Sequence, residues 1–213
     1  MVNAGTLPRT EGRRPGRPVG SDAARTRTEI LHVARRMIAE RGYPAMTFQG
    51  LATESGFSRT TLHYHFSSLD AIYQTLMTEA STVALRCIAL ASLESTLPDQ
   101  LTAYVTEFGR TGLNDRAMVA LLVSSRLTSS RTPAPTDDPG REVRAFLTRA
   151  VTDAIDRGEL SSDAEVTIMV DLLYAILWGI GFYAGFTDDA DHLESITRQM
   201  GNVLRFGLSG RHS

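Results

Sequence analysis

Apolar residues recur every three or four positions along most of this chain, the spacing that places them on one face of an α-helix. A first helix with this pattern runs from about Arg27 to Gly42, where a glycine is expected to end it in a left-handed conformation. A second, short helix begins with Thr47 as its N-cap and ends at Gly56, and a third begins at Ser58. The pattern therefore predicts three helices within the first third of the chain.

The remainder of the chain continues the helical spacing. Ser67 and Asp70 resemble a capping box, which predicts a fourth helix that extends to about Leu93. A polar, proline-rich loop is expected at residues 128–140, between two of the five helices that follow. Those five helices are expected at about residues 98–112, 114–127, 141–158, 163–186 and 189–206. No stretch shows a convincing alternation of a β-strand, so we predict an all-α fold of about nine helices.

The longest uncharged apolar run spans residues 172–186. This run has 15 residues, whereas a membrane crossing requires about 20. Asp171 precedes it directly, and Asp188 and Asp189 follow it closely. We therefore expect a buried helix and no membrane partner.

Composition places the chain among ordinary soluble globular proteins, with 42% hydrophobic residues. Residues 1–28 contain no apolar run, so no secretory signal is expected. Cys87, the one cysteine, has no partner for an internal disulfide, and we interpret it as a small core residue. Both features favour a cytoplasmic location.

The net charge of −2 conceals an asymmetry along the chain. Residues 1–66 contain 10 arginines and 5 acidic residues, whereas residues 67–213 contain 12 arginines and 19 acidic residues. Residues 1–20 are rich in glycine, proline and arginine, and we expect them to form a disordered basic arm. A basic first third is typical of contact with a polyanion such as nucleic acid, although a solvated basic tail has the same composition.

The second and third predicted helices are candidates for a helix-turn-helix because both are short and they meet at Gly56. In that motif the second helix enters the major groove of DNA with its N-terminal residues toward the base edges. Leu62 and Phe66 would face the core, which leaves polar and aromatic side chains outward. The outward residues are Ser58, Arg59, Thr60, Thr61, His63 and Tyr64. A plain surface helix would show the same division.

Residues 27–77 resemble the DNA-binding domain of the TetR family of transcriptional regulators, over the run ILHVARRMIAERGYPAMTFQGLATESGFSRTTLHYHFSSLDAIY. The positions that carry the resemblance are spaced without a gap and include Ala34, Glu40, Arg41, Gly42, Tyr43, Thr47, Leu51, Ala52, Gly56, Ser58, Thr61, Leu62, Tyr64, His65 and Phe66. The resemblance implies a three-helix helix-turn-helix domain at residues 21–67. It also implies a helical ligand-binding and dimerisation domain at residues 68–213.

The resemblance implies double-stranded DNA as a partner, with a palindromic operator bound by a homodimer. The candidate DNA-binding residues are Arg13, Arg14, Arg17, Thr47, Gln49, Ser58, Arg59, Thr60, Thr61, His63 and Tyr64. The arginines of the arm are expected either to enter a narrow minor groove or to add only nonspecific attraction. Three positions depart from the family pattern: Thr60 replaces a small residue, often glycine, His63 replaces a tyrosine, and Leu69 replaces a lysine.

The resemblance further implies that the last two helices form a four-helix bundle with those of a second subunit, and that the middle helices enclose a pocket for a small molecule. Residues 166–206 fit the dimer interface, because their glycines allow close helix approach, and an ordinary intramolecular core is the alternative for these helices. The candidate ligand-binding residues are Phe108, Met118, Leu122, Phe146, Tyr174, Trp178 and Phe182. For each of them a place in the core or in the dimer interface remains an alternative.

We therefore expect a DNA-binding transcriptional regulator, specifically a repressor that a small apolar or aromatic ligand releases from its operator. The alternative is a DNA-binding regulator with a filled core, controlled by a protein partner or constitutive. No catalytic motif is present, and the 5 histidines lack metal-ligand spacing. No glycine-rich phosphate loop follows a strand either. An enzyme, a cofactor or a metal site is therefore not expected.

Overall fold

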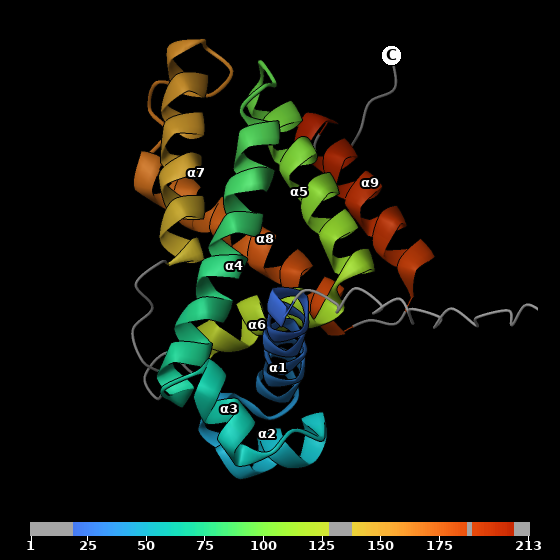
Figure 1. The fold of residues 1–213 in the computed structure, drawn as a ribbon. Helices are drawn as coiled ribbons and strands as arrows, with labels where there is room; N and C mark the ends of the chain where they lie inside the picture. Colours follow the sequence, from blue (N-terminus) through green and yellow to red (C-terminus); the bar gives the residue numbers. More distant parts are fainter. Residues whose placement is uncertain (1–18, 128–137, 187–188, 207–213) are drawn as a thin grey trace, which may run out of the picture.

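The computed structural model describes residues 19–127, 138–186 and 189–206. Within these residues the chain forms nine α-helices and one short 3-10 helix, with no β-strand (Figure 1). The all-α fold predicted from the sequence is confirmed. In chain order the elements are α1 (Val19–Arg41), η1 (Tyr43–Ala45), α2 (Phe48–Ser55), α3 (Arg59–His65), α4 (Leu69–Ala91), α5 (Leu97–Asn114), α6 (Arg116–Leu127), α7 (Pro139–Asp156), α8 (Val166–Phe186) and α9 (Ala190–Phe206).

Helices α1, α2 and α3 form a small head at one end of the molecule (Figure 1). Gly42 and Gly56 follow α1 and α2 with φ angles of 77° and 73°, positive values that glycine adopts without steric cost. Gly56 is a left-handed cap with a ψ angle of 4°, whereas Gly42 has a ψ angle of 159°, so the left-handed cap expected at Gly42 is wrong. Ile30, Leu51 and Leu62, one from each helix of the head, are fully buried in a common apolar cluster. The same cluster includes Met118 and Leu121 of α6, so the head shares part of its core with the rest of the molecule.

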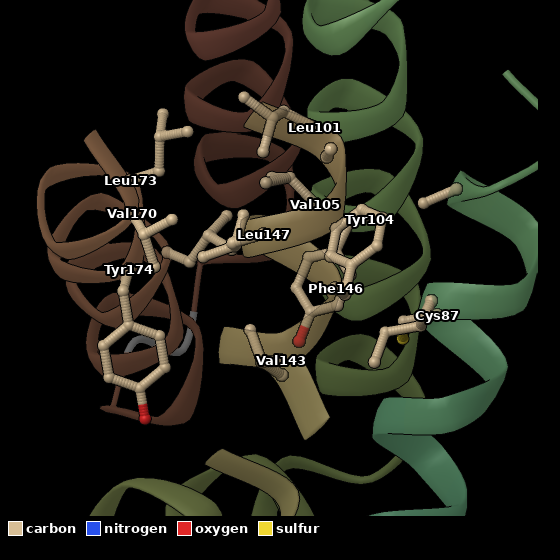
Figure 2. Packing of buried hydrophobic residues seen from close by; sticks show 14 of the residues in the cluster. Cys87, Leu101, Tyr104, Val105, Val143, Phe146, Leu147, Val170, Leu173 and Tyr174 are labelled. Carbon is tan, nitrogen blue, oxygen red and sulfur yellow. The ribbon is translucent and has the colours of Figure 1, made fainter. Parts of the chain in front are cut away.

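Helices α4 to α9 form the body, which α4 enters directly from the head (Figure 1). Helix α9 packs along α5, while α8 packs against α6 and α7. Figure 2 shows the apolar cluster at the centre of the body, with side chains from α4, α5, α7 and α8. Cys87 is part of this cluster, and burial raises the pKa of its thiol to about 12. The thiol therefore remains protonated, as befits a small core residue.

Two helices begin earlier than the sequence predicted. Helix α1 begins at Val19 rather than near Arg27, because the small and polar residues between them continue the helix without an apolar stripe. The last two residues of the expected arm are thus helical, and residues 1–18 lie outside the described residues. Helix α7 begins at Pro139 rather than near Arg141, since Asp138 caps it and accepts the Gly140 N–H at 2.9 Å.

The predicted capping box at the start of α4 is wrong by one residue. Ser68 rather than Ser67 is the N-cap, and its side-chain oxygen accepts the N–H of Ala71 at 3.0 Å. Asp70 instead accepts a hydrogen bond from the hydroxyl of Tyr43, which ties the start of α4 to η1. Every other boundary lies within three residues of its predicted position.

Helix α8 carries the most apolar sequence of the described chain. Its segment Val166–Tyr183 has a mean hydropathy of 1.7, and 28% of that segment is buried. By length and composition alone it could cross a membrane, but a core helix of a soluble protein passes the same test. The sequence suggested a buried helix, but much of the apolar surface of α8 is exposed in this structure.

Candidate DNA-binding surface and ligand pocket

The start of α3 is fixed by Ser58. Its side-chain oxygen accepts the N–H of Thr61 at 3.0 Å, and the two hydroxyl oxygens lie 2.8 Å apart. Leu62 is fully buried and Phe66 nearly so, which attaches the inner face of α3 to the head. The helix-turn-helix geometry thus arises from one cap and two apolar anchors.

The outward face of α3 presents side chains that are free to meet another molecule. Arg59 and Thr60 are exposed, and Tyr64 has 81% of its surface exposed. Within the described residues, the guanidinium of Arg59 forms no ion pair or hydrogen bond. His63 is also exposed, but its ring packs on that of Phe48 in α2 with 4.1 Å between the centroids. Such a surface of donors, acceptors and an aromatic ring is suited to a DNA groove.

The structure also shows what the other candidate DNA-binding residues do within the protein. Thr47 caps α2 by accepting the Gly50 N–H at 2.9 Å, just as Ser58 caps α3. Gln49, on the first turn of α2, is exposed beside this cap. The residues Arg13, Arg14 and Arg17 lie outside the described residues. Thr47, Ser58 and Thr61 therefore have a structural use whether or not DNA is bound.

Arg27 was not singled out by the sequence, yet it holds the far end of α3. Its guanidinium lies 4.1 Å from the centre of the Phe66 ring and donates to the carbonyl oxygen of His65 at 3.1 Å. Residues 27 and 65 are far apart in sequence, so no local pattern could have indicated this contact. Arg27 fixes the end of α3 against α1.

Part of the positive charge of the head is neutralised within the protein. Arg36 and Arg41 both contact Glu54, at 3.4 and 2.8 Å, and these contacts lower the pKa of that carboxyl group. The arginine excess of residues 1–66 is therefore not wholly available to DNA. Arg59 is an arginine that the fold leaves free on the outward face of α3.

A pocket lies in the body between α5, α6, α7 and α8, with a cavity volume of about 70 Å³. Apolar side chains form most of its wall, and none of the lining residues carries a charge. Four of the candidate ligand-binding residues line it: Phe108, Leu122, Tyr174 and Trp178. The other lining residues are Ala84, Tyr104, Val123, Ser125, Pro139, Gly140, Val143, Leu177 and Gly181.

Three of the candidate ligand-binding residues do not line this pocket. Met118 is buried in the cluster that α6 shares with the head. Phe146 points into the body core, where its ring stacks on that of Tyr104 at 5.9 Å (Figure 2). Phe182 is 53% exposed on the outside of α8. Tyr174, Trp178 and Phe182 are spaced four residues apart, and this spacing predicted that they share one face of the helix. Four residues rotate an α-helix by one full turn plus about 40°, so Phe182 points away from the face that carries Tyr174.

Arg144, a charged residue that does not line the pocket, packs against Tyr174 on the pocket wall. The guanidinium of Arg144 lies 4.3 Å from the centre of the Tyr174 ring and bonds to Asp171 at 2.6 Å. The hydrogen bond with Asp171 raises the pKa of Arg144, so the arginine stays charged. This arrangement orients the Tyr174 ring along the wall.

Helix α6 connects the pocket to the head through Arg35 of α1. Arg35 forms ion pairs with Glu79 of α4 and with Asp115, and only 12% of its side chain is exposed. Asp115 in turn accepts the N–H of Met118 at 3.0 Å and so holds the first turn of α6. We call this set of Arg35, Glu79 and Asp115 the Arg35 junction. The pocket-lining residues of α6 lie about 10–15 Å further along the same helix.

The outer face of α8 presents an apolar stripe. Ile168, Leu172 and Phe182 have 61%, 54% and 53% of their surfaces exposed, and Ala175 and Gly179 complete the stripe. Their spacing alternates between four and three residues, the repeat of helices that pack in a bundle. A Cβ added at Gly179 would meet no atom within 4 Å, so the middle of the stripe is flat and open. Such a stripe is suited to a second copy of the same helix.

Comparison with known proteins assigns the helix-turn-helix directly. Residues 30–76 match the family described as bacterial regulatory proteins, tetR family. The HTH-type transcriptional regulator UidR of Escherichia coli K12 is 22% identical over 188 residues, which are 86% of this chain and 95% of UidR. The matched segment covers α2 and α3, the elements that carry the outward surface described above.

Solved structures share the fold of the whole chain. The ketosteroid transcriptional regulator KstR2 of Mycobacterium tuberculosis superposes with a TM-score of 0.69 at 18% identity, over 84% of this chain and 92% of that one. A gamma-butyrolactone receptor, described as ArpA-like, superposes with a TM-score of 0.67 at 17% identity, over 87% and 98%. The tetR family match therefore covers the head, with its helix-turn-helix, and these solved structures share the fold of the whole chain.

Proposed function

We propose that this protein is a homodimeric, cytoplasmic repressor that binds a palindromic operator and leaves it when a small, uncharged, largely apolar molecule enters the pocket of the body. The observation that carries the proposal is the apolar pocket, whose wall includes α6, the helix that the Arg35 junction holds against the head. Regulators of this family bind DNA operators as dimers and respond to small-molecule ligands.

The outward face of α3 supports operator recognition. Arg59 is free within the described residues and stands in the first turn of α3, where a recognition helix meets base edges. Tyr64 and His63 lie one turn further and are suited to phosphate contacts. The arm with Arg13, Arg14 and Arg17 is proposed to follow the adjacent minor groove.

The apolar stripe of α8 supports dimerisation. Burial of a large apolar side chain contributes about 1.5–3 kcal/mol, so two symmetric copies of the stripe would bury enough apolar surface for a stable interface. A dimer places two copies of α3 on one face of DNA. These helices must lie roughly 34–36 Å apart, or a multiple of that distance, to reach successive major grooves.

Coupling between pocket and head follows from α4 and α6. Both helices contribute to the pocket, through Ala84 and Leu122, and both are tied to α1 by Arg35. A ligand that alters the distance between α6 and α8 therefore acts on the Arg35 junction and changes the spacing of the heads. For release, the ligand must bind the DNA-free geometry more tightly than the DNA-bound geometry.

The relatives are consistent with a small organic ligand. The names of two structural neighbours refer to a gamma-butyrolactone and to a ketosteroid. UidR and the family match concern transcriptional regulators, and within the described residues no group of three or more metal-binding side chains is found. We therefore assign neither an enzymatic activity nor a cofactor to the pocket.

The alternative is a regulator with a filled core that no small molecule controls. Footprinting of the protein on the DNA upstream of its own gene, followed by a screen for compounds that release it, separates the two. Protection of a palindrome and its loss with an uncharged compound support the proposal. Protection that no compound in a broad library relieves would support the alternative.

A further inference from the structure

Tyr104 places a hydroxyl group at the pocket. Its ring lies between those of Phe108 and Phe146, at centroid distances of 6.1 and 5.9 Å. The residue is 5% exposed and lines the pocket. In Figure 2 the hydroxyl oxygen, drawn red, lies on the side of the cluster toward Val143, which lines the same pocket. Stacked rings therefore hold this hydroxyl in position.

Within the described part of the chain, the hydroxyl of Tyr104 forms no hydrogen bond. The other two hydroxyl groups of the pocket wall belong to Ser125 and Tyr174. Ser125 donates to the carbonyl oxygen of Leu122 at 2.8 Å, and the Tyr174 ring lies against the guanidinium of Arg144, 4.3 Å from the ring centre. A hydroxyl group at a pocket wall that has no partner within the protein is left to hydrogen-bond with the contents of the pocket.

The surroundings of Tyr104 decide which partner suits it. Burial raises the pKa of Tyr104 above its ordinary value, so the group stays protonated and acts as a hydrogen-bond donor. The wall carries no charged side chain that could compensate a charge on a ligand. The missing partner is therefore an uncharged oxygen that accepts a hydrogen bond.

We propose that the Tyr104 hydroxyl binds the ligand by donating a hydrogen bond to a neutral carbonyl oxygen, as in a ketone or an ester, on an otherwise apolar molecule. The inference rests on the proposed function, because it takes the pocket to be the ligand site. It adds the chemical class of the ligand and the residue that selects it. The aromatic rings of Phe108 and Trp178 then contact the apolar part.

The test compares ketones with hydrocarbons of the same skeleton, namely acetophenone with ethylbenzene and cyclooctanone with cyclooctane. Dissociation constants are measured by ligand-observed NMR for the wild type and for Tyr104→Phe, a change that keeps the stacked ring. We expect the substitution to weaken ketone binding about three- to tenfold, the effect of one neutral hydrogen bond, and to leave hydrocarbon binding unchanged. Benzoate, the charged analogue, should not bind.

Two controls guard against an indirect effect. Tyr183→Phe removes a hydroxyl on α8 at a residue that does not line the pocket, and it should leave all four dissociation constants unchanged. Without ligand, Tyr104→Phe should melt at the same or a higher temperature than the wild type, because an unpartnered hydroxyl adds no stability. A lower melting temperature would reveal a protein partner for the hydroxyl and overturn the proposal.

The proposal also fails if ketones and hydrocarbons are weakened alike, if neither is weakened, or if none of the four probes binds the wild type. Benzoate binding as tight as that of acetophenone would overturn the restriction to uncharged ligands. The operator-release screen tests the proposed function separately: that function fails if no compound releases the protein from its operator. A compound that releases the wild type and Tyr104→Phe at the same concentration leaves the repressor function intact and removes Tyr104 as its anchor.

Discussion

Polar side chains of the helix-turn-helix divide into those that shape the motif and those that it presents. Thr47 and Ser58 accept backbone N–H groups at the starts of α2 and α3, so loss of either hydroxyl would weaken a helix start. Arg59 and Tyr64 have no such structural use and extend outward. DNA contact is therefore expected to depend most on the second group.

Arg59→Ala should weaken specific operator binding by about 1–3 kcal/mol if the guanidinium binds a guanine. The fold should be unaffected, because the side chain is exposed and makes no contact that α3 needs. Affinities for operator and for scrambled DNA, measured by fluorescence anisotropy, distinguish base contact from phosphate contact. Equal operator affinity of mutant and wild type would remove Arg59 from recognition.

At the residue scale the sequence was informative where the pattern is local. The caps of α2 and α3 follow from a hydroxyl residue before a short apolar pattern, and Thr47 and Ser58 were predicted in that way. The contact of Arg27 with Phe66 and the place of Tyr104 in the pocket depend on residues far apart in the chain. One sequence holds no signal for such pairs.

At the scale of the elements, periodicity predicted the helices because each has one face to bury. It could not say what each face contacts. In α8 nearly every position is apolar, so the pattern alone does not separate the pocket face from the outer face. The structure assigns Tyr174 and Trp178 to the pocket and Phe182 to the outer stripe. The angle between these positions around α8 decides the difference.

Leu172→Glu should raise the dissociation constant of the proposed dimer by about 100-fold or more, because the interface would lose two buried leucines and gain two buried charges. Sedimentation velocity measures the shift toward monomer. Leu85→Glu is the matched control, since Leu85 is also a half-exposed leucine, 49% against 54%, but lies on α4. An unchanged dimer in Leu172→Glu would exclude the α8 stripe as the interface.

At the scale of the whole molecule, the head and the body are not independent units. Met118 and Leu121 of α6 belong to the apolar cluster of the head, and α4 runs from the head to Ala84 at the pocket, about 22 Å from its start. The family resemblance implied a division of the chain into two domains. It did not indicate the helix through which they share a core.

Arg35→Gln should reduce the effect of a ligand on operator binding, because the Arg35 junction would no longer link α1 to α6. The stability cost should be about 1–2 kcal/mol, since both carboxylates remain partly exposed to water. Arg36→Gln is the matched control, as Arg36 pairs with Glu54 inside the head. In ligand titrations of the operator complex, Arg36→Gln should release operator at the wild-type ligand concentration, whereas Arg35→Gln should not. A normal response of Arg35→Gln would show that coupling takes another route.

The central claim is that occupation of the pocket and binding of the operator oppose each other. It is tested most directly by measuring the affinity of a releasing compound for the free protein and for the protein saturated with operator. Thermodynamic linkage requires the operator to weaken compound binding by the same factor, about 5- to 150-fold, by which the compound weakens operator binding. Equal affinity of the compound for free and operator-bound protein would contradict the claim.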